Sequence, residues 1–269
     1  MDKEIITDFH IHSVLSGDAY GTLEENIKSA IAKGCKYIAL TEHCNLDHLK
    51  HGQDVPTADL KLYDKEFKRL KKKYESQINM TYGIEMGYDK QVSADYGEII
   101  AKYDYDYIIN SIHIIEGNDC YWEKYFDTRT QREGFENYLK AVYESLSAPY
   151  RYNSVGHFGY ITRNCPFQNR DMLSGYEEHV EAILKKMIEK GVVLEANTSV
   201  NGAPGPCLPQ KEILTLYKAL GGELIIYGSD AHSPPSICRA REQTMRLLKE
   251  CGFRYHVVFI GKEIKQLLI

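Results

Sequence analysis

Several features that would place a protein in a membrane or in an oxidising compartment are missing from this sequence. It contains no run approaching about 18 consecutive apolar residues, so we expect no membrane-spanning helix. The charged start MDKE is not followed by a long apolar segment, so we expect no secretory signal peptide. The seven cysteines are odd in number and form no C-x-x-C pair, which predicts reduced thiols in a cytoplasmic protein.

Positive charge is also scarce, because 38 aspartates and glutamates outnumber 33 lysines and arginines and the net charge is −5. This balance argues against long nucleic acid or an anionic membrane surface as the partner. It is compatible with a small anionic substrate held by a few local arginines or lysines. Gly/Ser linkers, repeats and low-complexity segments are absent, so we expect residues 1–269 to form a single domain.

Short β-rich runs alternate with helical patterns along the chain. The β-rich runs are Ile5–Phe9, Tyr37–Leu40, Met80–Ile84, Tyr107–Ile112, Ser154–His157, Val192–Ala196, Leu224–Tyr227 and a last short one at His256–Ile260. The helical stretches are Leu23–Lys33, Leu60–Glu75, Tyr96–Lys102, Gly134–Leu146, Gly175–Lys190, Gln210–Leu220 and Arg239–Lys249. This alternation is typical of a parallel sheet with crossover helices, and seven or eight such units favour a closed barrel over an open sheet. No glycine-rich phosphate motif follows the first run, which argues against a dinucleotide-binding fold.

Histidines and carboxylates gather where the predicted strands end. His10 and His12 follow the first strand, and both can bind one ion because alternate residues of a strand point to the same face. The other strand-end residues are Glu42, His43, Glu85, His113, His157, Glu195, Asn197, Asp230 and His232. Since the carboxyl ends of barrel strands converge on one mouth, these residues predict a single metal-binding cluster there. Nitrogen and oxygen ligands without cysteine favour Zn, Fe, Mn or Co over Ca or Mg.

Other polar residues of the chain are expected to have different roles. The histidines that lie away from the strand ends are expected on the surface or in loops: His48, His51, His179 and His256. Cys44 directly follows His43, so its side chain should point away from the metal cluster. Asp8 and Glu42 are expected to orient the ligand histidines through hydrogen bonds.

Two connections are unusually long, and each is either a lid over the site or a surface elaboration. The first is Cys44–Asp59, a polar segment. The second is Glu116–Arg132, which carries Tyr121, Trp122, Tyr125 and Phe126. This aromatic group would suit a flat ring in the substrate.

The strand-end motifs resemble those of the polymerase and histidinol phosphatase family, known as the PHP family. The matching segments run in family order and cover nearly the whole chain: Asp8-x-His10-x-His12, Glu42-His43, Glu85, His113, His157 and Asp230-x-His232. The resemblance implies an α/β fold, a distorted seven-stranded (βα)7 TIM-like barrel, with a metal site at the C-terminal strand ends.

The resemblance also implies ligands for two or three divalent metal ions, expected to be Zn, Fe or Mn. The first ion would be bound by His10, His12, Glu85 and Asp230. Glu85 would bridge to the second ion, which His113 and His157 would also bind. The third ion would take His43, His232 and Asp18, at a position where some relatives have a histidine.

The length and the long loops are most similar to the histidinol-phosphatase branch of the family. This implies a phosphomonoesterase of histidine biosynthesis, in which a metal-held hydroxide attacks the phosphorus of histidinol phosphate. Arg163 lies where that branch offers a phosphate-binding arginine, and we expect His232, Asp230 and Arg163 to be catalytic. The proton for the leaving alkoxide would come from His232 or from a metal-bound water. The loop Asn197–Gln210 lacks the basic residue expected there, so the further candidates for phosphate binding are Arg129, Arg132, Arg239 and Lys211.

Three alternative functions remain open from the sequence. A PHP phosphodiesterase or exonuclease would act on a small nucleotide or on another small phosphate ester. An amidohydrolase also begins with His-x-His, but it commonly has a modified lysine where this chain has His113. A non-catalytic binding module with a metal-stabilised fold would be expected to have lost ligands, and this chain keeps every expected ligand position.

Overall fold

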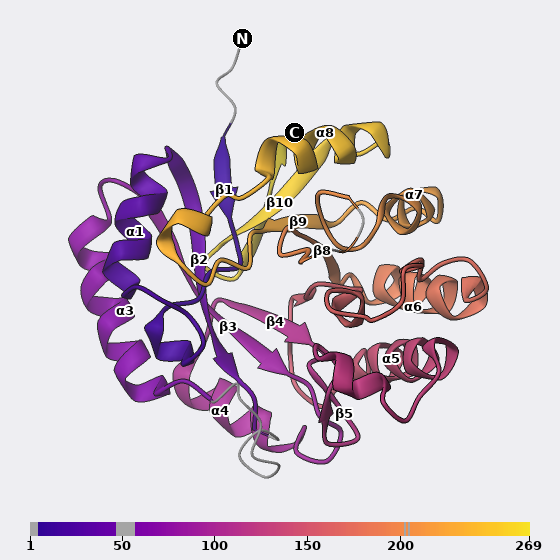
Figure 1. Ribbon diagram of the computed structural model, residues 1–269. Coiled ribbons are helices and arrows are strands. Elements are labelled where there is room, and N and C mark those ends of the chain that lie inside the picture. Colours follow the sequence, from indigo (N-terminus) through magenta and orange to yellow (C-terminus); the bar gives the residue numbers. More distant parts are fainter. Residues whose placement is uncertain (1–4, 47–56, 202, 204) are drawn as a thin grey trace.

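The computed structural model describes residues 5–46, 57–201, 203 and 205–269 (Figure 1). Its central feature is a sheet of seven parallel strands in the order β1-β2-β3-β4-β7-β8-β9. These strands are β1 (Ile6–Asp8), β2 (Cys35–Cys44), β3 (Asn79–Gly87), β4 (Tyr107–Ser111), β7 (Ser154–Val155), β8 (Val193–Asn197) and β9 (Ile225–Gly228). The sequence prediction of a seven-stranded α/β barrel is confirmed.

The first and last strands meet at a seam that nearly closes the sheet into a barrel. Just beyond the strands, the backbone N–H of His12 donates to the carbonyl of Ala231 at 2.9 Å. The buried carboxylate of Asp8 adds two links, because it accepts hydrogen bonds from the N–H groups of Ser229 and Cys238, both at 2.8 Å. Residues from opposite ends of the sequence therefore lie side by side at this seam.

Helices surround the sheet on its outer side (Figure 1). They are α1 (Leu23–Ala32), α3 (Leu60–Tyr74), α4 (Asp95–Tyr103), α5 (Gln131–Ser145), α6 (Glu177–Lys190), α7 (Lys211–Ala219) and α8 (Arg241–Glu250). In α3, Tyr63, Phe67 and Leu70 are buried and spaced as one face of a helix, so this face packs on the strands. Thr22 and Thr130 begin α1 and α5 with capping boxes, in which each threonine bonds the glutamate three residues later.

A C-terminal hairpin fills one end of the barrel. It consists of β10 (Tyr255–Ile260) and β11 (Glu263–Leu268), which pair in antiparallel fashion. Phe259 of β10 is buried among residues of the barrel interior, and its ring lies 4.8 Å from that of Tyr107. The hydroxyl of Thr81, near the start of β3, donates to the Phe259 carbonyl at 2.7 Å. Since β10 occupies the amino-terminal end, the opposite mouth is left for the polar strand-end residues.

The structure differs from the predicted elements in three places. β2 runs to Cys44 rather than ending at Leu40, because the polar residues at its end line the barrel mouth. The short hairpin of β5 (Ile114–Ile115) and β6 (Asn118–Asp119) was not predicted, nor was the largely exposed strand β11. No helix in the described part of the chain is long and apolar enough to cross a bilayer.

We expect Phe259→Ala to lower the free energy of unfolding by about 3–5 kcal/mol, because it leaves a cavity in the plug of the barrel. Ile264→Ala is the matched control, since Ile264 is the register partner of Phe259 but is 46% exposed. Urea unfolding of the two variants measures the difference. Equal losses would show that β10 does not close the barrel.

Candidate metal centre and active site

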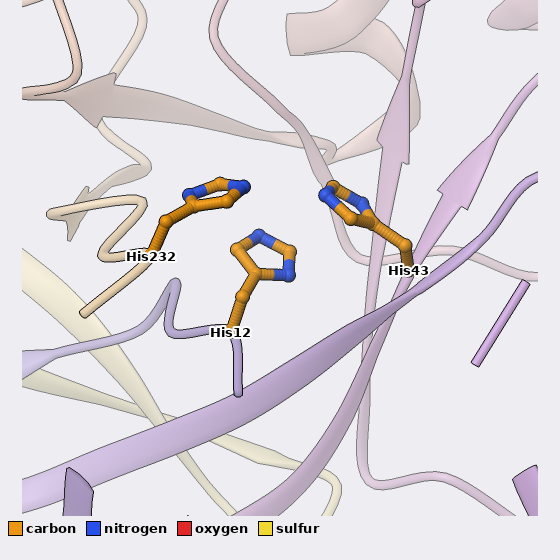
Figure 2. A group of neighbouring side chains, drawn as sticks. All are labelled: His12, His43 and His232. Atoms are coloured by element: carbon orange, nitrogen blue, oxygen red, sulfur yellow. The ribbon is translucent and has the colours of Figure 1, made fainter. Parts of the chain in front are cut away.

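The strand ends bring the predicted ligand residues together at one mouth of the barrel. A pocket of about 430 Å³ opens there, and its wall includes Asp18, His43, His113, His157, Asp230 and His232. His10, His12 and Glu85 lie beneath it with no exposed surface. Figure 2 shows His12, His43 and His232, which come from different parts of the barrel wall, with their rings close together.

The first group of facing donor atoms contains His10, His12, Glu85 and Asp230. Glu85 Oε2 lies 3.4 Å from Nε2 of both histidines. Asp230 Oδ1 lies 3.7 Å from His10 Nε2 and 3.3 Å from His12 Nε2. Two imidazoles and two carboxylates therefore point at a common centre.

The second group shares Glu85 with the first. Its other oxygen, Oε1, lies 3.3 Å from His113 Nε2 and 2.8 Å from His157 Nε2. These two imidazole nitrogens are 3.2 Å apart. One carboxylate thus faces a histidine set on each side, as a bridging ligand would.

The third group lies nearest the solvent. Asp18 Oδ2 is 3.4 Å from His43 Nε2 and 3.3 Å from His232 Nε2. The side chain of His232 is 33% exposed, whereas that of His43 is 6% exposed. Asp18, which the family resemblance placed in this group, therefore lies within reach of both histidines.

The donor atoms fit divalent cations. Three of those that face the first centre are buried without a hydrogen-bond partner: His10 Nε2, His12 Nε2 and Glu85 Oε2. Buried polar atoms normally have partners, so unpaired donor atoms that converge on one point suit the binding of an ion. Nitrogen and oxygen donors of this kind suit Zn, Fe or Mn.

The electrostatics of the site favour a bound cation as well. Burial alone would raise the pKa of the Glu85 carboxyl, but His10, His113 and His43 hold that pKa well below its usual range. Burial would lower the pKa of His43, but the carboxylates of Glu85 and Asp18 outweigh it and raise that pKa to about 10. Without metal, protons on imidazoles such as His43 supply the positive charge that the carboxylates require.

Two of these residues adopt a backbone conformation that is unusual for any residue other than glycine. His157 has a φ of 26° and Asp230 a φ of 51°. Strain of this kind persists only where surrounding contacts hold it. Glu195 Oε2 accepts a hydrogen bond from His157 N at 2.6 Å, and Tyr138 contacts the same turn, accepting one from Gly159 N at 3.0 Å.

Several small or buried polar residues hold the predicted ligands in place, and sequence reasoning did not assign them this role. Glu195 Oε1 lies 2.6 Å from His10 Nδ1, and Asn45 Oδ1 lies 2.9 Å from His113 Nδ1. Ser111 donates to Glu85 Oε1 at 2.7 Å. The position of Glu195 at a strand end was the available signal, whereas Asn45 and Ser111 are common turn residues that carry none.

Asp8 and Glu42 support the ligand histidines, as expected, but they do so through backbone groups and a serine rather than by contact with the rings. Glu42 contacts no histidine ring among the described residues, but it accepts hydrogen bonds from Ser13 N and from the hydroxyl of Ser16. Ser16 in turn lies 3.3 Å from His12 Nδ1, so Glu42 acts through it. Asp8 bonds backbone N–H groups at the seam and therefore fixes the turn that carries Asp230.

The candidate substrate-binding residues separate into two sets. Arg163 and Arg239 line the pocket, as do Tyr121 and Trp122. The other basic candidates lie away from the pocket in ion pairs or on aromatic rings: Arg129, Arg132 and Lys211. Tyr125 and Phe126 are buried in the core, so only the first half of the predicted aromatic loop faces the site.

Away from the mouth, Cys44 is buried in the core, as expected from its position beside His43. His256 is buried in β10 rather than exposed, and burial lowers its pKa to about 4. His179 is exposed on α6. His48 and His51 lie outside the described residues.

A model of the PHP domain matches residues 8–199 of the sequence. The chain belongs to the PHP family. Among its relatives is a Lactococcus lactis histidinol-phosphatase, 28% identical over 259 residues that span 96% of this chain and 95% of that protein. A Clostridium acetobutylicum protein named as a probable histidinol-phosphatase is 27% identical over 261 residues, or 97% of this chain and 98% of that protein.

Solved structures of the PHP family extend the likeness to the fold. The crystal structure of histidinol phosphate phosphatase from Lactococcus lactis, complexed with zinc, L-histidinol and phosphate, superposes with a TM-score of 0.83. The two proteins share 27% sequence identity, and the superposition covers 96% of this chain and 98% of the Lactococcus lactis chain. The PHP relative therefore binds zinc, and overlapping sets of the His, Asp and Glu residues described above lie close enough together to hold metal ions in this chain too.

We expect Glu85→Gln to lose more bound metal than Asp18→Asn, because the Glu85 carboxylate faces nitrogen atoms of five histidines and that of Asp18 faces two. The measurement is elemental analysis of purified, zinc-reconstituted protein, in which the wild type should carry more than one equivalent. Glu181→Gln, in an exposed ion pair on α6, is the control and should retain wild-type metal. Full metal content and near wild-type turnover in the Glu85 variant would contradict the bridging role.

We also expect zinc binding to release protons at neutral pH, because the raised pKa of His43, about 10, means that this imidazole is protonated before metal binds. Affinity should therefore rise as the pH rises toward 10 and fall below neutrality. Calorimetry in two buffers with different ionisation enthalpies measures the proton count. A binding enthalpy independent of the buffer would rule out this proton exchange.

Proposed function

We propose that this chain is a metal-dependent phosphomonoesterase and that its substrate is histidinol phosphate, in histidine biosynthesis. The observation that carries the proposal is the convergence of three donor groups beneath one pocket, in a chain whose relatives are named histidinol-phosphatases. The ligands proposed are His10, His12, Asp18, His43, Glu85, His113, His157, Asp230 and His232. Zinc is the metal best supported, and iron or manganese would suit the same donors.

The chemistry needs both the metals and the chain's own groups. When bound, divalent ions act as Lewis acids that offset phosphoryl charge and lower the pKa of water. Arg163 donates to Asp230 at 2.7 Å and therefore fixes the carboxylate that faces His10 and His12. The guanidinium has five donors, so it can hold Asp230 and still contact a phosphoryl oxygen in the pocket.

His232 is assigned to the side of the site where the leaving alcohol departs. Its side chain is the most exposed of the ligand histidines, at 33%, and it lines the pocket. Its Nδ1 contacts the Asp230 carbonyl at 3.0 Å, which orients the ring. Tyr121 and Trp122 also line the pocket and offer flat surfaces for an imidazole ring.

The remaining expectations also belong to this proposal. We propose that residues 1–269 work as one domain, because Asp230 and His232 lie beyond the segment that the PHP model matches. A cytoplasmic location is supported by the seven cysteines, all of which are free thiols. The partner proposed is a small phosphate ester rather than long nucleic acid or a membrane surface, as the net charge of −5 suggests.

The test compares histidinol phosphate with a nucleoside monophosphate, a sugar phosphate and a phosphodiester, using zinc-loaded protein. Histidinol phosphate should have the highest kcat/KM. Arg163→Ala should lower kcat/KM by roughly 10-fold to 100-fold, because it removes a charged hydrogen bond and unpairs Asp230. Arg163→Lys keeps the positive charge but lacks the paired N–H donors of the guanidinium, so it should recover only part of the activity.

If the phosphodiester has the highest kcat/KM of the four substrates, the chain is a phosphodiesterase and the proposal is wrong. Hydrolysis of a cyclic amide, with no phosphate ester cleaved, would favour an amidohydrolase. Unchanged monoester kinetics in Arg163→Ala would remove Arg163 from the site while leaving the metal ligands untested by that variant.

A further inference from the structure

The wall of the pocket contains few cations. Two of its lining residues in the described part of the chain are arginines, Arg163 and Arg239, whereas three are aspartates: Asp18, Asp119 and Asp230. The loop 197–210, which contributes Ser199 and Asn201 to the wall, contains no lysine or arginine. A phosphate dianion in this pocket therefore has two guanidinium groups from which to draw compensation.

The charge of Arg163 is already paired within the protein. Its Nη2 donates to Asp230 Oδ2 at 2.7 Å and to Asn197 Oδ1 at 2.8 Å. The side chain is 4% exposed and its guanidinium lies over the ring of Tyr160, 4.9 Å from the centroid. Much of its charge is offset by Asp230 before any ligand enters.

The side chain of Arg239, in contrast, has few partners within the described part of the protein. Its side chain makes no ion pair with any residue that the structure describes, and its one hydrogen bond is a long one, from Nη2 to the Ser229 carbonyl at 3.3 Å. It is exposed and lines the same pocket as His232. Its charge is therefore available to a ligand.

The backbone that carries Arg239 is, by contrast, held tightly. Tyr227 donates its hydroxyl proton to the Arg239 carbonyl at 2.8 Å, and Cys238 N is bonded to Asp8. Both neighbours of Arg239 have positive φ, 59° for Cys238 and 52° for Ala240. Non-glycine residues rarely adopt this conformation, and such strain gathers at functional sites. In this chain it also occurs at His157 and Asp230, within the metal centre.

We infer that Arg239 is the second phosphate-binding cation of this site, in place of the basic residue that the loop 197–210 lacks. The inference rests on the proposed phosphomonoesterase function and adds a specificity-determining residue to it. A free guanidinium on a fixed, strained turn is pre-organised to pair with two oxygens of a phosphate dianion.

The experiment uses zinc-loaded protein and two readouts, hydrolysis of histidinol phosphate and binding of inorganic phosphate measured by calorimetry. Arg239→Gln should raise both KM and the Kd for phosphate by about tenfold or more, the loss expected for one charged hydrogen bond. Arg239→Lys should recover part of the phosphate affinity because it keeps the charge. Zinc content and the thermal midpoint should not change in either variant.

Arg132→Gln is the matched control, since Arg132 is 70% exposed on α5 and paired with Glu136 outside the pocket. It should leave KM and phosphate affinity unchanged. If the wild type hydrolyses histidinol phosphate and Arg239→Gln has the same KM and phosphate Kd as the wild type, the inference is overturned and the proposed function still stands. Phosphate affinity that depends on Arg239, in a protein that hydrolyses no phosphomonoester, overturns the proposed function instead.

Discussion

The carboxylate of Glu85 lies out of contact with solvent and within 3.4 Å of nitrogen atoms from five histidines. An ionised carboxylate in such a place costs several kcal/mol unless cations or donors surround it. β3 supplies Glu85, and the strands on both sides of it supply the imidazoles, so the charge is compensated only when the sheet has curled into a barrel. The fold and the candidate metal centre therefore depend on each other through this one side chain.

Much of the architecture could be predicted because the strands are buried on both faces and are separated by long helical patterns. The exceptions have physical causes. β2 was predicted too short because polar residues such as Glu42 and His43 are typical of loops. The sequence alone does not show that they line the mouth of the barrel. The hairpin of β5 and β6 consists of two-residue strands, which carry no periodic pattern.

The site, like the fold, could be predicted from the sequence only in part. Histidines and carboxylates at strand ends are conspicuous in a sequence, so the residues that the structure brings together could be named in advance. The supporting contacts could not, because Ser111 and Asn45 reach their partners across strands that are far apart in the sequence. Arg163 illustrates the limit, since its position predicted a pocket residue but not the ion pair with Asp230 that absorbs part of its charge.

The seam between β1 and β9 sets an order on the assembly of the protein. Asp8 is synthesised before the other six strands of the barrel, but Ser229 and Cys238, the partners of its carboxylate, are made only after β9. Asp230 and His232 emerge at the same late stage. A nascent chain therefore cannot bring all the candidate ligands together until the seven strands are complete, and a metal bound there would stabilise only complete barrels. A chain that stops before β9 would lack this stabilisation and would be more open to proteolysis.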